Sequence, residues 1–258
     1  MKISAFTALG FIILTSLSCK GQPQTSYMKI DTIEFAFNDI RPSLDTIKTD
    51  SCTIDSVFHL TKYTPVKCTM GFTDSKPSKD NSDIKFCIPA AFTSKELTYV
   101  VGDYIVGGRF VGQSSDVENG YCAIIKGRVI IRPLDEKVER MMIRVVETKG
   151  DFFRQMLLMY DYEPVLCTIF DNYRPTFRRA LVEQGRGEVF ILESEERLTI
   201  CEFQTMLQRL GVKNALYLDM GTWSEGFYRD KYNEITSIGK QTQSTKYQTN
   251  WLFFQKKD

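Results

Sequence analysis

Residues 195–226, EERLTICEFQTMLQRLGVKNALYLDMGTWSEG, contain the signals for a helix, a buried strand and a glycine loop in succession. Thr199 and Glu202 have the T-x-x-E spacing of a capping box, which satisfies free backbone N–H groups where a helix begins. Apolar residues then recur three or four positions apart until Gly211, where a glycine favours the end of the helix. The short apolar run Ala215–Leu218 predicts a strand that is buried on both faces.

Asp219 follows this strand directly and precedes the loop Met220–Gly226. A strand holds such a carboxylate in place, and a glycine loop beside it lets a ligand approach the backbone. Asp219 is therefore the first candidate for a catalytic group. The alternative is that it caps the strand or stabilises the loop.

Several separated positions resemble the phosphodiester glycosidase family, which includes the mannose-6-phosphate uncovering-enzyme domain. They are Arg178-Arg179-Ala180, Leu198-Thr199 with Glu202, and the run NALYLDMGTWSEG at 214–226. The family pattern is R-T-A-x-G, a strand, G-x-T-x-x-E, then N-A-x-x-L-D-G-G-G-S. The version in this chain resembles more closely a branch of Bacteroidetes lipoproteins in which LDMG-x-W and a terminal T-N-W strand occur. The resemblance covers residues 155–226, with a weaker echo at 86–92.

This resemblance implies an N-acetylglucosamine-1-phosphodiester α-N-acetylglucosaminidase-like activity, in which a sugar is released from a sugar-1-phosphodiester. Asp219 would act on the glycosidic bond, as carboxylates do in glycosidases. Arg179 would hold the phosphate, because a guanidinium makes a bidentate contact that lysine cannot reproduce. The substrate-binding positions that the resemblance implies are Gln155, Arg178, Gly221, Trp223 and Ser224.

Two departures from the family pattern favour a second interpretation. Pro89 stands where the family has an asparagine, and Met220 replaces a glycine of the loop. Proline offers neither a side-chain hydrogen bond nor a backbone donor. The alternative function is therefore a catalytically degraded, glycan-binding envelope lipoprotein of the same fold, while Arg179 with Asp219 favours the hydrolase. A structural envelope protein without a ligand is the third option.

The N-terminus indicates export. Residues 1–19 have a positive start and an apolar run, as in a signal peptide, and end in the lipobox-like sequence Ser16-Leu17-Ser18-Cys19. Lipidation of Cys19 would anchor the protein to a membrane. The alternative is a soluble secreted protein. Residues 20–27 form a polar tether, and 28–258 the phosphodiester glycosidase-like domain. We expect a bacterial envelope lipoprotein on the periplasmic or cell-surface side.

Composition limits the other functions. The chain has 258 residues with 33 basic and 32 acidic side chains, so no basic excess indicates a nucleic-acid partner. The single histidine, His59, excludes a site of several histidines, and its surroundings Ser56–Thr61 predict a strand. No cofactor is predicted and no metal ligands are assigned. A divalent cation stays open, since oxygen ligands are present without an EF-hand spacing.

The pattern predicts an α+β fold: a strand-rich mixed sheet with a few packed helices, at about 136–147 and 199–210. The loop 73–82 and the stretch 227–246 are expected to be polar and turn-rich. The expected strands include Ile30–Phe37, Ile84–Phe92, Gln155–Tyr160, Val189–Glu193 and Tyr247–Gln255, with a hairpin that turns on Lys126-Gly127.

Overall fold

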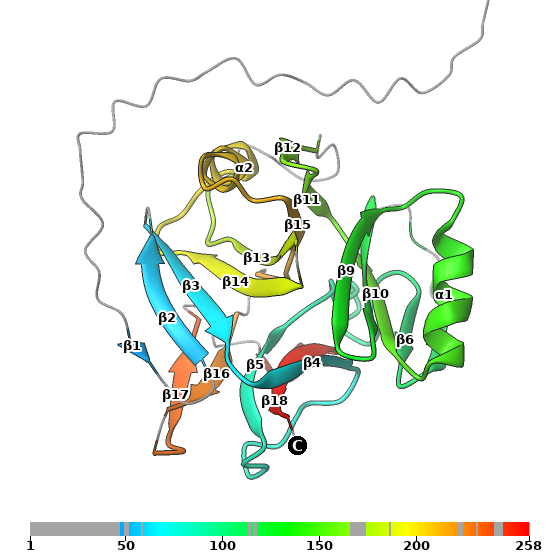
Figure 1. The fold of residues 1–258 in the computed structure, drawn as a ribbon, viewed down its shortest axis with the longest axis horizontal. Coiled ribbons are helices and arrows are strands. Elements are labelled where there is room, and N and C mark those ends of the chain that lie inside the picture. Colours follow the sequence, from blue (N-terminus) through cyan, green and yellow to red (C-terminus); the bar gives the residue numbers. More distant parts are fainter. Residues whose placement is uncertain are drawn as a thin grey trace, which may run out of the picture.

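The computed structural model describes residues 47–48, 52–57, 59–112, 115, 118–165, 174–185, 187–220, 224–230, 232–239 and 245–257. Within these residues the strands form three antiparallel sheets, with one α-helix packed on the first and one on the second (Figure 1). The predicted strand-rich α+β class is confirmed, with three antiparallel sheets where one mixed sheet was expected. The leader and tether (1–27) and the strand expected at Ile30–Phe37 lie outside the described residues.

The first sheet contains Arg179, and its strand β15 leads to Asp219, so it positions both residues that the sequence singles out for catalysis. Its strands in spatial order are β1 (Ile47–Lys48), β2 (Cys52–Val57), β3 (Leu60–Pro65), β14 (Glu188–Ser194), β13 (Arg179–Gly185), β15 (Asn214–Tyr217), β11 (Leu157–Tyr160) and β12 (Glu163–Pro164). Helix α2 (Ile200–Arg209) packs on it, and the predicted capping box of Thr199 and Glu202 is confirmed. Phe203 and Leu207 point from α2 into a buried cluster against this sheet.

The second sheet lies beside the first and is covered by the other helix. Its order is β7 (Arg109–Val111), β6 (Tyr104–Val106), β10 (Asp151–Gln155), β8 (Gly120–Ile125) and β9 (Arg128–Pro133). Helix α1 (Val138–Glu147) buries Val145 against it. The predicted hairpin turn is confirmed, since Lys126 and Gly127 both have positive φ, 50° and 74°.

The third sheet contains the C-terminal strand. Its order is β17 (Ile235–Ile238), β16 (Gly226–Arg229), β5 (Ile84–Pro89), β18 (Trp251–Lys256) and β4 (Cys68–Thr73), and a short 3₁₀ helix, η1 (Thr245–Tyr247), precedes β18. Its inner face joins a core shared with the other two sheets. In that core Phe72 of the third sheet stacks on Phe153 of the second, with ring centroids 4.8 Å apart, and Leu216 of the first sheet packs in the same cluster.

The prediction of one strand over Gln155–Tyr160 is wrong. The chain leaves the second sheet after Gln155 and enters the first at Leu157, so Met156 alone spans the crossing. All three side chains are buried, which is why the run has the composition of a single buried strand. The correction places Gln155 at the junction between two sheets.

Two further expectations also differ from the structure. Ser56–Thr61 is not one strand, because β2 ends at Val57 and β3 begins at Leu60. His59, between them, has φ 59°, and its side chain is 40% exposed beside Glu196. The stretch 227–246 contains the hairpin of β16 and β17. Polar residues on the exposed strand β17 hide that hairpin from a hydrophobicity pattern.

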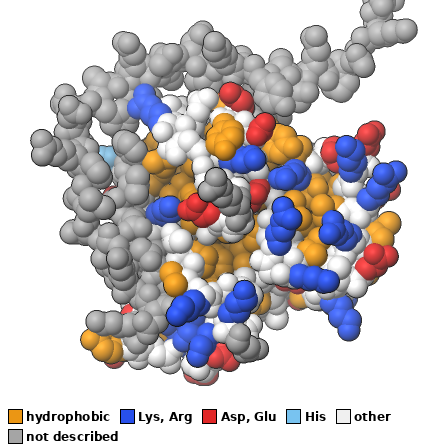
Figure 2. Space-filling view, viewed as in Figure 1, with side chains coloured by type: hydrophobic (Ala, Val, Ile, Leu, Met, Phe, Trp, Pro, Cys, Tyr) orange, Lys and Arg blue, Asp and Glu red, His pale blue; other side chains and the backbone are white. Residues whose placement is uncertain are grey.

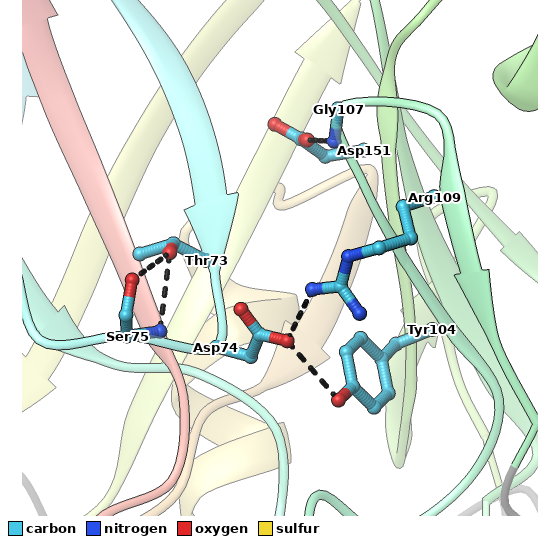
Figure 3. A network of polar contacts seen from close by, with 7 residues as sticks. All are labelled: Thr73, Asp74, Ser75, Tyr104, Gly107, Arg109 and Asp151. Atoms are coloured by element: carbon cyan, nitrogen blue, oxygen red, sulfur yellow. Dashed lines mark hydrogen bonds and ion pairs between the residues drawn. The ribbon is translucent and has the colours of Figure 1, made fainter.

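A polar network joins the second and third sheets (Figure 3). Asp74, directly after β4, accepts from Arg109 Nη2 at 2.6 Å and from Tyr104 Oη at 3.3 Å. Asp151 accepts from the backbone N–H of Gly107 at 2.8 Å and of Phe72 at 3.0 Å. These contacts fix the end of β4 against the β6–β7 hairpin.

The surface in Figure 2 has charged side chains of both signs around hydrophobic side chains in the middle of the face. Among the described residues, no helix combines the length and the apolar character needed to cross a bilayer.

A buried carboxyl group beside Gly102 gives this fold a pH dependence. Glu118 is 6% exposed, and neither carboxylate oxygen has a well-formed hydrogen bond among the described residues. Burial raises the pKa of Glu118, and nearby Ser115 and Arg154 offset this only in part. Because folding raises this pKa, the folded state binds a proton at Glu118 more tightly than the unfolded state does.

Glu118→Gln should therefore stabilise the protein at neutral pH. The contribution of Glu118 to folding is fully present below its ordinary pKa of 4.5 and is lost as the pH rises through the raised value. Relative to wild type, the variant should gain unfolding free energy progressively as the pH rises from 4 to 8, because it removes the buried carboxyl group whose ionisation the folded state disfavours. Urea unfolding across this range measures the difference, and a difference independent of pH would contradict the account.

Candidate active site

Asp219 lies two residues after the end of β15, beside Arg179 at the start of β13. Arg179 opens β13, and its carbonyl accepts from the backbone N–H of Leu218 at 3.0 Å, so Asp219 is the next residue along the adjacent chain. The backbone N–H of Asp219 in turn donates to the carbonyl of Ala90 at 2.9 Å, just after β5. The site therefore lies where the first and third sheets meet, which no local sequence pattern specifies.

The Arg179 side chain is fully buried, and two of its three guanidinium nitrogens are hydrogen-bonded. Its Nε and Nη2 donate to Oε2 of Glu193 at 2.9 and 2.5 Å, and Nη2 also donates to the carbonyl of Ser224 at 3.0 Å. Arg179 and Glu193 are direct partners in the β13–β14 register, so the sheet itself sets this pair. No hydrogen-bond partner for Nη1 exists in the structure as described.

An enclosed guanidinium nitrogen without an acceptor is unusual, because buried polar groups in proteins are almost always hydrogen-bonded. The Glu193 carboxylate neutralises the cation and fixes its orientation. Nη1 then presents an N–H donor to whatever oxygen occupies the adjacent space. Charge-assisted bonds from arginine to phosphate oxygens are among the strongest hydrogen bonds available.

Gln155 shares an acceptor with Asp219. Its Nε2 donates to the Ala90 carbonyl at 3.3 Å, and its Oε1 accepts from the backbone N–H of Met156 at 2.8 Å. The side chain has no exposed surface. Gln155 thus ties the crossing between the sheets to the segment that holds Asp219, and its amide groups are committed to the backbone.

Arg178 has a different environment from its neighbour. Its Nε donates to the Leu198 carbonyl at 2.9 Å, and its Nη2 to the Arg174 carbonyl at 2.8 Å. Its Nη1 lies 3.5 Å from the hydroxyl of Tyr217. Burial raises the pKa of Tyr217, with the Arg178 charge opposing the shift. The guanidinium of Arg178 therefore holds the segment before β13 against the start of α2.

The loop after Asp219 is described only in part. Gly221 and Trp223, both predicted to bind substrate, lie outside the described residues. Ser224 is buried, and its carbonyl rather than its hydroxyl is the group that contacts Arg179. Met220 is 1% exposed and packs in the cluster beside α2. The methionine side chain is thus part of the core.

Asn250 occupies a place that the sequence analysis missed. Its Oδ1 accepts from the backbone N–H of Ala91 at 2.6 Å, and its Nδ2 donates to the Ala91 carbonyl at 2.9 Å. The next residue, Trp251, pairs with Pro89 across the strands. A buried asparagine from the C-terminal strand therefore fixes the backbone beside Pro89. Its position before Trp251 in the T-N-W run was the available signal.

Glu193 is the second residue that the sequence analysis missed. It belongs to the run VFILES, where a single acid among apolar residues has no partner within reach along the chain. Only the β13–β14 register places it opposite Arg179. Glu202, by contrast, is engaged in its capping box, with Oε2 accepting from the Thr199 N–H at 2.7 Å.

No cluster of three or more histidine, cysteine, aspartate or glutamate side chains suitable for a metal ion exists within the described ranges. The polar groups gathered at the junction of the two sheets are instead one guanidinium, one amide and two carboxylates. Within this set the Nη1 group of Arg179 is the donor left for a ligand oxygen among the described residues, and Asp219 is the carboxylate that is not part of the Arg179–Glu193 pair.

Comparison with solved structures shows that this fold is similar to that of a known catalytic domain. No protein-family profile matches the sequence, and a comparison with curated proteins finds no relative. Among solved structures, the chain is similar to the catalytic domain of zebrafish N-acetylglucosamine-1-phosphodiester α-N-acetylglucosaminidase, auto-inhibited by its pro-peptide. That match has 12% identity and a TM-score of 0.54, and it covers 86% of this chain and 85% of that one.

A hypothetical protein from Synechocystis matches with 12% identity and a TM-score of 0.51, over 84% of this chain and 64% of that one. At these identities the similarity concerns the fold alone. The chain therefore has a fold distantly related to that of a phosphodiester glycosidase catalytic domain.

Proposed function

We propose that this protein is a hydrolase that cleaves a sugar from a sugar-1-phosphodiester. Arg179 would bind the phosphate, and Asp219 would act at the anomeric carbon. The similar fold of the zebrafish enzyme, whose name specifies an N-acetylglucosamine-1-phosphodiester, makes that sugar the first to test. The observation that carries the proposal is the buried Nη1 of Arg179, which has no hydrogen-bond acceptor among the described residues. Arg179 lies beside Asp219, because its carbonyl binds the N–H of Leu218.

The proposed reaction is hydrolysis of the bond between the anomeric carbon and the bridging phosphate oxygen. That bond breaks with its electron pair going to the oxygen, so a phosphate monoester leaves. Water supplies the hydroxyl at the anomeric carbon and a proton to the solvent or the product. Asp219 would stabilise the oxocarbenium-like transition state and orient the water. Phosphate is a weakly basic leaving group, so the guanidinium of Arg179 can assist its departure without a general acid.

A glycan-binding protein without activity is the second candidate. It is favoured by the full enclosure of Arg179, whose charge Glu193 already compensates. It is also favoured by Pro89 at the end of β5, where the family pattern has asparagine. The amide of Asn250 nearby does not replace it, because both its ends bind Ala91. Sugar-phosphodiester binding without turnover would identify this second function.

For the location we propose an exported envelope lipoprotein, anchored through Cys19. The support is the sequence of residues 1–19 alone. In a bacterial host, wild type should partition with membranes and incorporate a labelled fatty acid. Cys19→Ser should abolish the labelling and release the protein into the soluble fraction. Equal labelling of both proteins would disprove lipidation at this cysteine.

Asp219→Asn should remove hydrolysis while leaving binding intact. Loss of a carboxylate that acts in the transition state typically lowers kcat by about 10²- to 10⁴-fold. The measurement is release of N-acetylglucosamine from its 1-(methyl phosphate) diester, with affinity for N-acetylglucosamine 1-phosphate measured in parallel by calorimetry. Undiminished turnover in the variant would remove Asp219 from the proposed site.

Arg179→Lys should lower kcat/KM by about 10²-fold or more, because lysine cannot contact Glu193 and a phosphate together in the geometry of a guanidinium. Arg178→Lys is the matched control next in sequence, since its guanidinium binds the carbonyls of Leu198 and Arg174. That variant should lose thermal stability but keep most of its kcat/KM. Equal losses of activity in both variants, at equal folded fractions, would contradict a specific role for Arg179.

A further inference from the structure

The loop 74–83, between β4 and β5, is held firmly at both ends. At one end Asp74 is bound by Arg109 and Tyr104 (Figure 3). At the other end Arg229, which is 4% exposed, donates from Nη2 to the carbonyls of Lys79 and Asn81. The loop therefore places its side chains before any ligand arrives, which lowers the entropic cost of binding.

Two lysines of this loop lie over aromatic rings on the outer face of the third sheet. Lys76 Nζ is 5.4 Å from the ring centroid of Trp251, and Lys79 Nζ is 5.8 Å from that of Phe227. Lys79 Nζ also lies 3.5 Å from Oε1 of Glu225. Both distances to the rings are within the range of cation–π attraction.

These lysines belong to the surroundings of Arg179. Glu225, the partner of Lys79, directly follows Ser224, whose carbonyl accepts from Arg179. Trp251, under Lys76, pairs with Pro89, and the carbonyl of the next residue, Ala90, accepts from the Asp219 N–H. Burial raises the pKa of the Cys87 thiol, and the charges of Lys76, Lys79 and Arg179 oppose that rise.

A charge count at the junction shows why additional cations are needed. The guanidinium of Arg179 is already compensated by the Glu193 carboxylate, and Asp219 adds a further carboxylate. A phosphodiester also carries a negative charge, so these three residues alone would repel it. Lys76 forms no ion pair among the described residues, and Lys79 is only partly compensated by Glu225 at 3.5 Å. The loop also carries Asp74, Asp80 and Asp83, of which Asp74 is paired with Arg109 and Asp80 is bonded to Ser78. Lys76 and Lys79 lie over Trp251 and Phe227, so they are the charges that the loop directs to this face.

We infer that Lys76 and Lys79 are specificity-determining residues, which select an anionic sugar-phosphate over a neutral glycoside at this site. The inference rests on the proposed function and extends it to the substrate's charge. Their contribution is to binding rather than to bond cleavage, because they lie on an accessible loop, with the side chain of Lys79 39% exposed.

The test compares Lys76→Gln/Lys79→Gln with wild type on two substrates. On the 1-(methyl phosphate) diester of N-acetylglucosamine, kcat/KM should fall about tenfold through KM, with kcat unchanged, and its dependence on salt should flatten. On the neutral p-nitrophenyl N-acetyl-α-glucosaminide the two proteins should be equal. Lys85→Gln is the matched control, since Lys85 lies on β5 and binds Asn233 at 3.2 Å.

Calorimetry with N-acetylglucosamine 1-phosphate separates failure of this inference from failure of the proposed function. Wild type that binds the sugar phosphate without cleaving the diester would end the hydrolase proposal. The lysines would then still be tested by the expected tenfold weaker binding of the double variant. A double variant as active and as tightly binding as Lys85→Gln would overturn the inference, as would wild type that fails to bind the sugar phosphate.

Discussion

The fully enclosed ion pair of Arg179 and Glu193 is the interaction on which the rest of the site depends. The two residues face each other across β13 and β14, so the pair forms only when these strands pair in this register. Breaking a buried pair by removing one partner typically costs about 3–5 kcal/mol, because the remaining charge stays buried. The second bond of Nη2, to the Ser224 carbonyl, extends this constraint to the segment that leads into β16.

A second interaction, at the Ala90 carbonyl, joins the three sheets at this site. The Ala90 carbonyl, just after β5, accepts from both the Asp219 N–H and the Gln155 amide. Gln155 ends a strand of the second sheet, and Asp219 follows a strand of the first. A single carbonyl thus joins the three sheets where the candidate catalytic carboxylate lies. Pre-organised groups of this kind need no rearrangement during a reaction.

The sequence predicts the local features of this fold well. The capping box at Thr199, the turn at Lys126-Gly127 and the helix expected at about 136–147 each depend on residues close together in the chain, and each is confirmed. Prediction from the sequence fails where the pairing of distant strands determines the structure. Gln155–Tyr160 has the composition of one strand because both halves are buried, although they belong to different sheets. The partners of Arg179 are 14 and 45 residues away, so neither Glu193 nor the Ser224 carbonyl follows from spacing.

The central claim is that the unpaired Nη1 of Arg179 receives a phosphate oxygen. A crystal structure of the folded domain with N-acetylglucosamine 1-phosphate tests it most directly. The account predicts a phosphate oxygen within hydrogen-bond distance of Nη1, about 2.7–3.0 Å, with the contact to Glu193 retained and the anomeric carbon next to Asp219. A sugar phosphate bound elsewhere, with Nη1 bonded only to water or protein, would contradict the account.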